Sequence, residues 1–301
     1  MVANPNRLAA DTLSMEPAIT VLTPAPAAGA RPILAAAHQR AEGEVRLSAG
    51  PDGDRTRLRD FRQAGSLRCL FPRREPGRLD AMLLNTGGGL IGGDRFTVRA
   101  EALPGARLAL TTQTAERAYA ALPGERSVVR TRLNVGAGAR LDWLPQETIL
   151  FEGAALDRRL AVSLAAGARL LLVEPLVFGR TARGEQLREA RLKDRLVIDR
   201  EGVPLWRDGI DLAGDVSARL DSGSTAGGAR ALATVLFVAP EAEAHLDAVR
   251  AAMPDTGGAS LVAQDMLALR VLAPDGYTLR RTLLPVLDRL TGGDLPKPWR
   301  M

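Results

Sequence analysis

Hydrophobic and polar residues alternate in short segments along most of this chain. Examples are residues 45–47, 127–133, 158–164 and 195–199, and glycine and aspartate separate such segments. Alternation of this kind is typical of a half-buried β-strand, because successive side chains of a strand point to opposite faces of a sheet. The pattern therefore predicts a body built of β-strands. Glu201 and Gly202, which lie between two of these segments, predict a hairpin turn.

A four-residue motif, Gly-Ala-Arg-Leu, occurs three times within this region. It begins at Gly105, Gly138 and Gly167, at offsets of 33 and 29 residues, and each copy follows one alternating segment and opens another. Turn-and-strand units that recur at such a period indicate stacked β layers, either solenoid-like or sandwich-like. The third copy opens the longest apolar segment, so we expect that strand to be the most buried.

The last third of the chain has a different pattern. Residues 240–253 begin with a proline followed by acidic residues, as a helix N-terminus does. Residues 275–290 place Leu279, Leu283, Leu287 and Leu290 on one helical face, and we expect Pro285 to kink this helix. Two further strands are predicted between these helices, at residues 260–263 and 267–272. The expected fold is mainly β, a multilayer β-sandwich or β-solenoid-like body with two C-terminal helices.

The N-terminal segment differs in composition from the rest of the chain. It is rich in alanine and proline, which predicts a flexible leader over residues 1–40 and a single β-rich domain over residues 41–301. We find no Lys/Arg-led apolar segment of the secretory kind and no apolar run long enough to span a bilayer. These features predict a cytoplasmic protein with no membrane partner.

Composition also limits the kinds of binding site that we expect in this chain. The 40 basic and 35 acidic residues give a mild, dispersed net charge of +5, and aromatic residues make up only 4% of the chain. Nucleic-acid binding is therefore disfavoured, since there are few platforms for base stacking. One cysteine, Cys69, and two histidines, His38 and His245, leave little material for a thiolate or histidine metal site.

Glycines are unusually dense between residues 83 and 94. The five are Gly87, Gly88, Gly89, Gly92 and Gly93, and Asp94 follows them directly. A P-loop would need a Lys and then a Ser or Thr after its last glycine, and a dinucleotide-binding loop would open a helix, whereas the residues that follow alternate like a strand. An acid at the exit would also repel phosphate. We interpret this segment as a structural glycine loop between strands.

Acidic residues also occur where the pattern predicts buried strands. Glu147 and Glu174 lie in apolar segments, and Glu185 follows shortly after the second of them. Acids are rarely buried without a partner, so one explanation is ion pairing with Arg180, Arg183 or an arginine of a neighbouring strand. Another is that Asp94, Glu147, Glu174 and Glu185 converge on a polar passage whose oxygen ligands hold a divalent ion loosely. Paired carboxylates could equally serve a glycosidase.

Four ordered motifs lie at residues 84–94, 110–113, 143–149 and 178–185, and together they form a specific signal. They resemble the UreD family of urease accessory proteins, also called UreH. The likeness extends from about residue 42 to the C-terminal helix. Residues 62–72 depart from the family, because they are rich in arginine and lack its aromatic-proline pattern, and the alanine- and proline-rich leader is particular to this chain.

The resemblance implies a non-enzymatic maturation factor. It would bind apo-urease with the helical partner UreF and the GTPase UreG and help to load nickel through an interior channel. On this hypothesis Asp94, Glu147, Glu174 and Glu185 line the passage, no cofactor is tightly bound, and nickel is only in transit. Three further residues would make supporting or partner contacts, namely Gln113, Gln146 and Arg180. The alternatives are a pure scaffold without metal passage, and a β-rich carbohydrate-active hydrolase.

Overall fold

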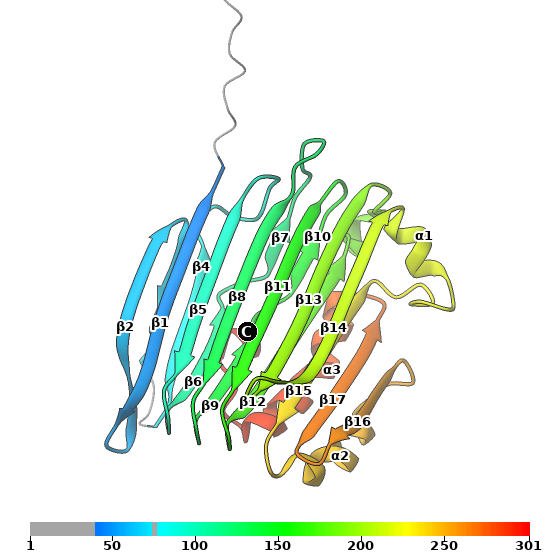
Figure 1. The fold of residues 1–301 in the computed structure, drawn as a ribbon. Coiled ribbons are helices and arrows are strands. Elements are labelled where there is room, and N and C mark those ends of the chain that lie inside the picture. The colour runs from blue at the N-terminus through cyan, green and yellow to red at the C-terminus, as the bar shows by residue number, and fades with distance from the viewer. Residues whose placement is uncertain (1–39, 74–76) are drawn as a thin grey trace, which may run out of the picture. The chain divides into compact units, whose positions relative to one another are not determined.

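Two β-sheets lie face to face and form most of the structure (Figure 1). The computed structural model describes residues 40–73 and 77–301, so the predicted leader falls, up to residue 39, outside the described residues. Among the described residues, one sheet has seven strands in the order β14-β13-β11-β8-β5-β1-β2. These strands are β1 (Glu42–Asp52), β2 (Arg55–Gly65), β5 (Arg95–Ala102), β8 (Ser127–Val135), β11 (Ala155–Leu164), β13 (Ala190–Arg200) and β14 (Val203–Gly214).

The facing sheet has ten strands in the same part of the chain. Eight follow the order β16-β17-β15-β12-β9-β6-β4-β3, and β10 joins β12 to β7 beside them. The strands are β3 (Leu67–Leu70), β4 (Leu79–Asn85), β6 (Arg107–Thr112), β7 (Glu116–Ala118), β9 (Arg140–Leu144), β10 (Thr148–Leu150), β12 (Arg169–Phe178), β15 (Ala231–Val238), β16 (Gly257–Ala263) and β17 (Met266–Ala273).

The chain alternates between the sheets, and this makes the centre of the fold solenoid-like. β4, β6, β9 and β12 are parallel neighbours in one sheet, and β5, β8, β11 and β13 are parallel neighbours in the other. Arg140 pairs with both Arg107 and Arg169, so the three Gly-Ala-Arg-Leu motifs stand side by side in register. The repeat in the sequence is therefore one coil of the solenoid, as predicted.

Glycine is needed at the start of each repeat because the chain turns there. Gly105, Gly138 and Gly167 have φ angles of +75°, +63° and +67°, in a region of backbone conformation that residues with a Cβ rarely adopt. The hairpin predicted at Glu201 and Gly202 is also present, with φ angles of +50° and +79°, and it joins the antiparallel pair β13 and β14.

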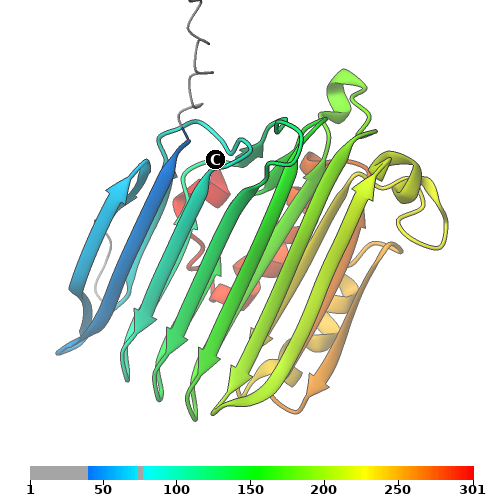
Figure 2. The same cartoon turned by 45° about the horizontal axis from the view of Figure 1, so that its top comes forward.

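Helices cover the ten-stranded sheet on the side away from the other sheet (Figures 1 and 2). The two predicted late helices are α2 (Ala242–Ala251) and α3 (Gly276–Thr291). The four leucines predicted for one face of α3 are all buried, and the helix continues through Pro285. A short helix α1 (Val216–Asp221) and two 3₁₀ helices, η1 (Thr181–Arg183) and η2 (Lys297–Arg300), were not predicted.

Buried side chains form two layers, one on each face of the ten-stranded sheet. The first layer lies between the sheets, and the second lies between the ten-stranded sheet and the helices. β12 contributes to both layers, with Leu172 and Leu176 in the first and Leu171 and Val173 in the second. This confirms that the strand after the third repeat is deeply buried. No helix within residues 40–73 and 77–301 has the length and apolar character needed to cross a membrane.

Candidate functional site

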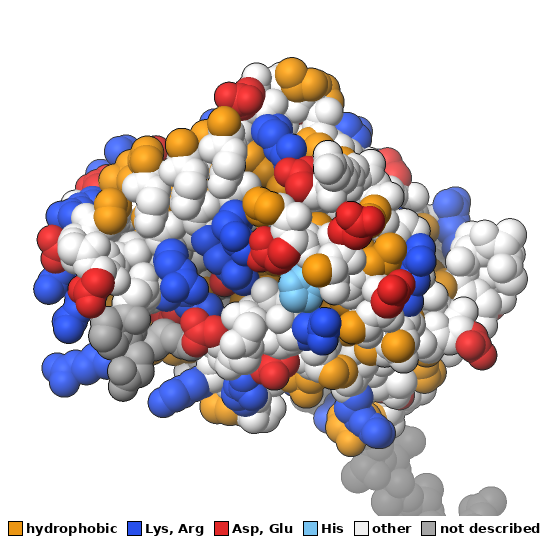
Figure 3. Space-filling view, turned by 90° about the horizontal axis from the view of Figure 1, so that it is seen from below, with side chains coloured by type: hydrophobic (Ala, Val, Ile, Leu, Met, Phe, Trp, Pro, Cys, Tyr) orange, Lys and Arg blue, Asp and Glu red, His pale blue; other side chains and the backbone are white. Residues whose placement is uncertain are grey.

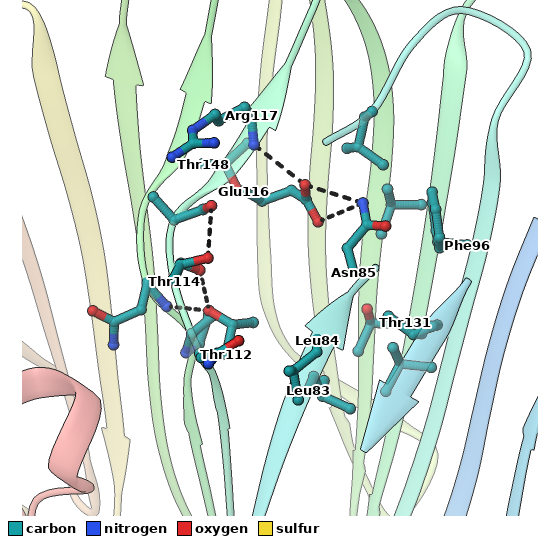
Figure 4. A pocket seen from close by; sticks show the side chains of 18 of the residues that line it. Leu83, Leu84, Asn85, Phe96, Thr112, Thr114, Glu116, Arg117, Thr131 and Thr148 are labelled. Atoms are coloured by element: carbon teal, nitrogen blue, oxygen red, sulfur yellow. Dashed lines mark hydrogen bonds between the residues drawn. The ribbon is translucent and has the colours of Figure 1, made fainter. Parts of the chain in front are cut away.

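A cavity of about 370 Å³ lies between the two sheets. Its apolar walls include Leu83 of the ten-stranded sheet and Phe96 and Leu156 of the seven-stranded sheet. Exposed residues among its lining mark its mouth, and they come from the glycine loop, from the connection between β6 and β7, and from β7 itself; they are Thr86, Gly88, Gln113, Thr114 and Arg117. Part of this lining is drawn in Figure 4.

Glu116 of β7 places a carboxylate in the cavity wall. Its side chain and that of Asn85 point toward each other, and Asn85 Nδ2 donates to both carboxylate oxygens at 3.2 and 3.3 Å (Figure 4). The backbone N–H of Arg117 donates to Oε1 at 3.2 Å. Burial outweighs these bonds and raises the pKa of Glu116 to about 7. The carboxyl therefore changes charge near neutral pH.

Glu174 of β12 is the second carboxylate of the cavity, and it is held by a buried arginine. Arg158 of β11 donates to Glu174 Oε2 at 2.7 Å, and Trp143 Nε1 donates to Oε1 at 2.6 Å. Arg158 also binds both oxygens of Asp194, at 3.0 and 2.5 Å. Burial is the main influence and raises the pKa of Glu174, whereas Arg158 and Trp143 lower it. Because β11 and β12 belong to different sheets, this ion pair ties the sheets together.

Asp94 lies at the exit of the glycine loop and is almost fully buried. Its carboxylate accepts hydrogen bonds from the backbone N–H groups of Ala41 at 2.8 Å and Ile91 at 2.9 Å. Asn85 also contacts this loop, because its Nδ2 donates to the carbonyl of Gly89 at 2.8 Å. Asp94 therefore fixes the loop that borders the cavity mouth, and it is not among the residues that line the cavity.

Glu147 and Gln146 face the C-terminal helix. Arg280 of α3 donates to Gln146 Oε1 at 2.6 Å and lies 3.4 Å from Glu147 Oε1. Gln146 also lines the cavity, and its Nε2 is buried without a hydrogen-bond partner in the described structure. Glu147 does not line the cavity.

Glu185 and Arg180 form a pair beyond the far end of β12. Arg180 Nη2 donates to Glu185 Oε1 at 2.6 Å, and the backbone N–H of Arg180 donates to Oε2 at 2.8 Å. The Arg180 side-chain hydrogen bond lowers the pKa of Glu185. Arg180 also lies over the ring of Phe151, 4.5 Å from its centre. Neither member of the pair lines the cavity.

The structure thus places only part of the predicted set at the cavity. Glu174, Gln113 and Gln146 line it, whereas Asp94, Glu147, Glu185 and Arg180 do not. The four predicted acids do not lie together, and no group of three or more metal-ligating side chains occurs within the described residues. A metal role for these four residues stays a prediction.

Two cavity residues, Glu116 and Arg158, were missed in the sequence. The signal for Arg158 was its strand alternation, which places it on the same face as the buried residues Leu160 and Val162. Glu116 follows a stretch of polar residues and belongs to a strand of only three residues, so its strand pattern was too short to read.

These features define a class of protein: a two-sheet β-solenoid with a helical layer and an internal cavity that carries two carboxylates. Residues 41–300 match the family model of the UreD urease accessory protein. Similar proteins named urease accessory protein UreD occur in Ruegeria pomeroyi, with 49% identity over 79% of this chain and 92% of that protein, and in Roseobacter denitrificans, with 46% identity over 87% and 96%. A third, from another Ruegeria species, is 44% identical over 92% of this chain and 96% of that protein. The chain belongs to the UreD family of urease accessory proteins, which serve urease maturation.

Proposed function

We propose that this chain is a non-enzymatic maturation factor of the cytoplasm that binds apo-urease together with UreF and UreG. In this role it helps to deliver nickel to the urease active site through the cavity between its sheets. Family membership supports the link to urease. Nickel delivery goes beyond that membership, and the cavity between the sheets supports it.

The observation that carries the nickel step is the pair of carboxylates in the cavity wall. Glu116 and Glu174 offer hard oxygen ligands to a divalent ion that is the cargo. Both are already hydrogen bonded or ion paired, so an ion would compete with Asn85 at one and Arg158 at the other. Such competition favours weak, reversible binding, which suits transfer. Asp94, Glu147 and Glu185 would then shape the surroundings through their own partners.

The first test is co-expression with urease and its other accessory proteins, with and without this chain. We expect nickel content and urease activity only when the chain is present. If urease reaches the same nickel content and activity without the chain, and the chain does not associate with apo-urease, the proposal is wrong.

The second test fills the cavity. Ala115 lines it and is half-buried, so Ala115→Trp should obstruct it, whereas Ala137→Trp adds the same ring at an exposed turn. We expect the first variant to fold and associate with apo-urease but to leave urease nickel-poor, while the second behaves like the wild type. Normal nickel content in both variants would contradict a route through this cavity.

A pure scaffold is the second candidate, and the pairing of the acids favours it. Asp94, Glu174 and Glu185 all have structural partners, so each could serve stability alone. Glu174→Gln separates the two functions. Loss of urease activation at unchanged stability and association supports passage, whereas lower stability with full activation at a permissive temperature supports the scaffold.

A further inference from the structure

No other element of the described structure covers the outer face of the seven-stranded sheet. It is turned toward the viewer in Figure 1, and α2 and α3 lie on the opposite side of the body, behind the ten-stranded sheet. Alternate residues of β1, β5, β8, β11 and β13 point outward from it. The cavity and its acids do not reach this face.

Arginines stand next to one another across the strands of this face. In one row Arg46 of β1 is paired with Arg62 of β2 on one side and with Arg99 of β5 on the other. Arg99 is in turn paired with Arg132 of β8. The row therefore places four arginines on four adjacent strands.

The next row continues this arrangement toward the other edge of the sheet. Arg159 of β11 stands between Arg130 of β8 and Arg195 of β13, and it is paired with both. Neighbouring strands are about 4.8 Å apart, and like charges that are directly opposite are destabilising. Two rows of such contacts therefore add electrostatic repulsion to the sheet as long as no partner covers this face.

Acidic neighbours offset only one part of this face. Arg99 pairs with Glu44 at 3.2 Å, Arg46 with Asp60 at 3.4 Å, and Arg130 with Asp157 at 2.9 Å. Arg132, Arg159 and Arg195 are exposed and have no ion pair in the described residues; we call these three the arginine triad. At the lower end of the body, by contrast, basic and acidic side chains are interspersed (Figure 3).

We propose that this face is a docking surface for an acidic surface of a partner protein, centred on the arginine triad. The proposal rests on the proposed function, because it places the partner in the urease maturation complex. Seven strands of 8 to 12 residues give a face of roughly 30 by 33 Å, somewhat more than the ~800 Å² that one side of a stable interface buries. Carboxylates that meet the triad would replace repulsion with ion pairs.

Two other occupants fit less well. Residues 1–39 of this chain contain two acidic and two basic residues, so the leader cannot supply the negative charge. Nucleic acid would meet carboxylates within the same face, such as Glu44 and Asp157, and would find no aromatic side chain in these two rows on which to stack a base. A protein surface with discrete carboxylates matches the pattern.

The test compares two triple charge reversals in the full chain. One is R132E/R159E/R195E, and the control is R183E/R188E/R219E, which changes net charge equally at exposed arginines outside this sheet. Each chain is co-expressed with tagged urease and the other accessory proteins, and its retention on urease is measured over a range of salt. We expect the triad variant to lose at least about tenfold in retention and the control to match the wild type, with wild-type retention falling as salt rises. Equal retention of all three would overturn the proposal.

A second measurement tests the docking proposal independently of urease maturation. If the wild-type chain does not support urease maturation, that result refutes the proposed function alone. The second measurement titrates the purified chains with an oligoglutamate peptide and with an oligothymidylate of equal charge. Peptide binding that the triad reversal abolishes and the control keeps supports docking of an acidic protein. No peptide binding by the wild type, or tighter triad-dependent binding of the oligothymidylate, overturns it. Thermal unfolding of each variant checks folding, and R132Q/R159Q/R195Q, which removes the charge without reversing it, should lie between the wild type and the reversal.

Discussion

At the scale of single residues, the interior carboxyls are controlled by burial and by one or two partners each. Glu116 has only neutral hydrogen-bond donors, Asn85 and the Arg117 backbone N–H, so burial dominates its pKa. Glu174 has the cation of Arg158 beside it, so two large opposing influences act on its pKa. Similar residues in one cavity therefore have different sensitivities to pH and to mutation.

Glu116→Gln should change how stability depends on pH. The pKa of Glu116 is raised from 4.5 to about 7 in the folded chain, so between these values the folded state binds more protons than the unfolded state. The free energy of unfolding of the wild type therefore falls as pH rises through this window. The variant lacks this contribution, and its stability relative to the wild type should rise by on the order of 3 kcal/mol between pH 4.5 and 7 and then level off.

Urea unfolding at a series of pH values measures this difference. Glu101→Gln, at an exposed position of β5, is the control and should follow the wild type at every pH. Parallel curves for Glu116→Gln and the wild type would show that burial does not govern this carboxyl.

Arg158→Met should be strongly destabilising. It leaves the buried carboxylates of Glu174 and Asp194 without their cation, and removal of one partner from a buried ion pair costs about 3–5 kcal/mol. Its neighbour Arg159 points to the opposite, outer face, so Arg159→Met should change stability by no more than about 0.5 kcal/mol. Chemical denaturation of both variants checks the contrast, and similar losses would refute the inward role of Arg158.

At the scale of elements, the glycine loop between β4 and β5 is fixed by contacts as well as by its dihedral angles. Gly89 has φ +154°, and a Cβ there would lie 2.3 Å from a ring carbon of Tyr119 and 2.7 Å from the carbonyl oxygen of Arg117. Gly88 has φ +78° but open space around the same position. The two glycines are therefore required for different reasons.

Gly89→Ala should be more costly than Gly88→Ala. The first change adds a steric clash with backbone and a ring to the conformational strain, for a loss of about 3 kcal/mol. The second adds strain alone, about 1–2 kcal/mol. Thermal unfolding of the two single variants measures the order, and a reversed order would contradict the packing of Tyr119 against this loop.

At the scale of the whole molecule, the second buried layer joins the end of the chain to the solenoid. Trp299 of η2 is fully buried, and its Nε1 donates to the carbonyl of Leu144 at the end of β9 at 2.9 Å. Arg280 of α3 lies over its ring, 5.0 Å from the centre. Because Arg280 also holds Gln146, the C-terminal residues support a wall of the cavity.

Trp299→Ala should therefore destabilise the fold by about 3–5 kcal/mol, the usual cost of removing a buried aromatic ring. Tyr277 is also on the C-terminal segment but is 72% exposed, so Tyr277→Ala should have little effect. Denaturant midpoints for both variants test this. An equal effect of the two would show that the C-terminal residues do not anchor the helical layer.

The sequence by itself determined the features that depend on local patterns. Alternation placed the strands, the Gly-Ala-Arg-Leu repeat indicated the coils of the solenoid, a proline followed by acidic residues predicted α2, and apolar spacing predicted α3. Four short motifs indicated the family, which the comparisons confirm. Alternation and helical spacing lie within a few residues of chain, where backbone geometry dictates which side chains share a face, and the repeat and the motifs are short segments that are recognised one by one.

Only the tertiary structure decided which side chains meet. Arg158 and Glu174 lie on different sheets, and their contact depends on how those sheets pack. The sequence pattern grouped Asp94, Glu147 and Glu185 with Glu174, yet in the structure each of the three finds its own partner and does not line the cavity. Alternation placed Arg159 on a strand, but its position between Arg130 and Arg195 follows from the register of three strands. Register and sheet packing are set by contacts between residues far apart in the chain, and the local pattern of one sequence does not contain them.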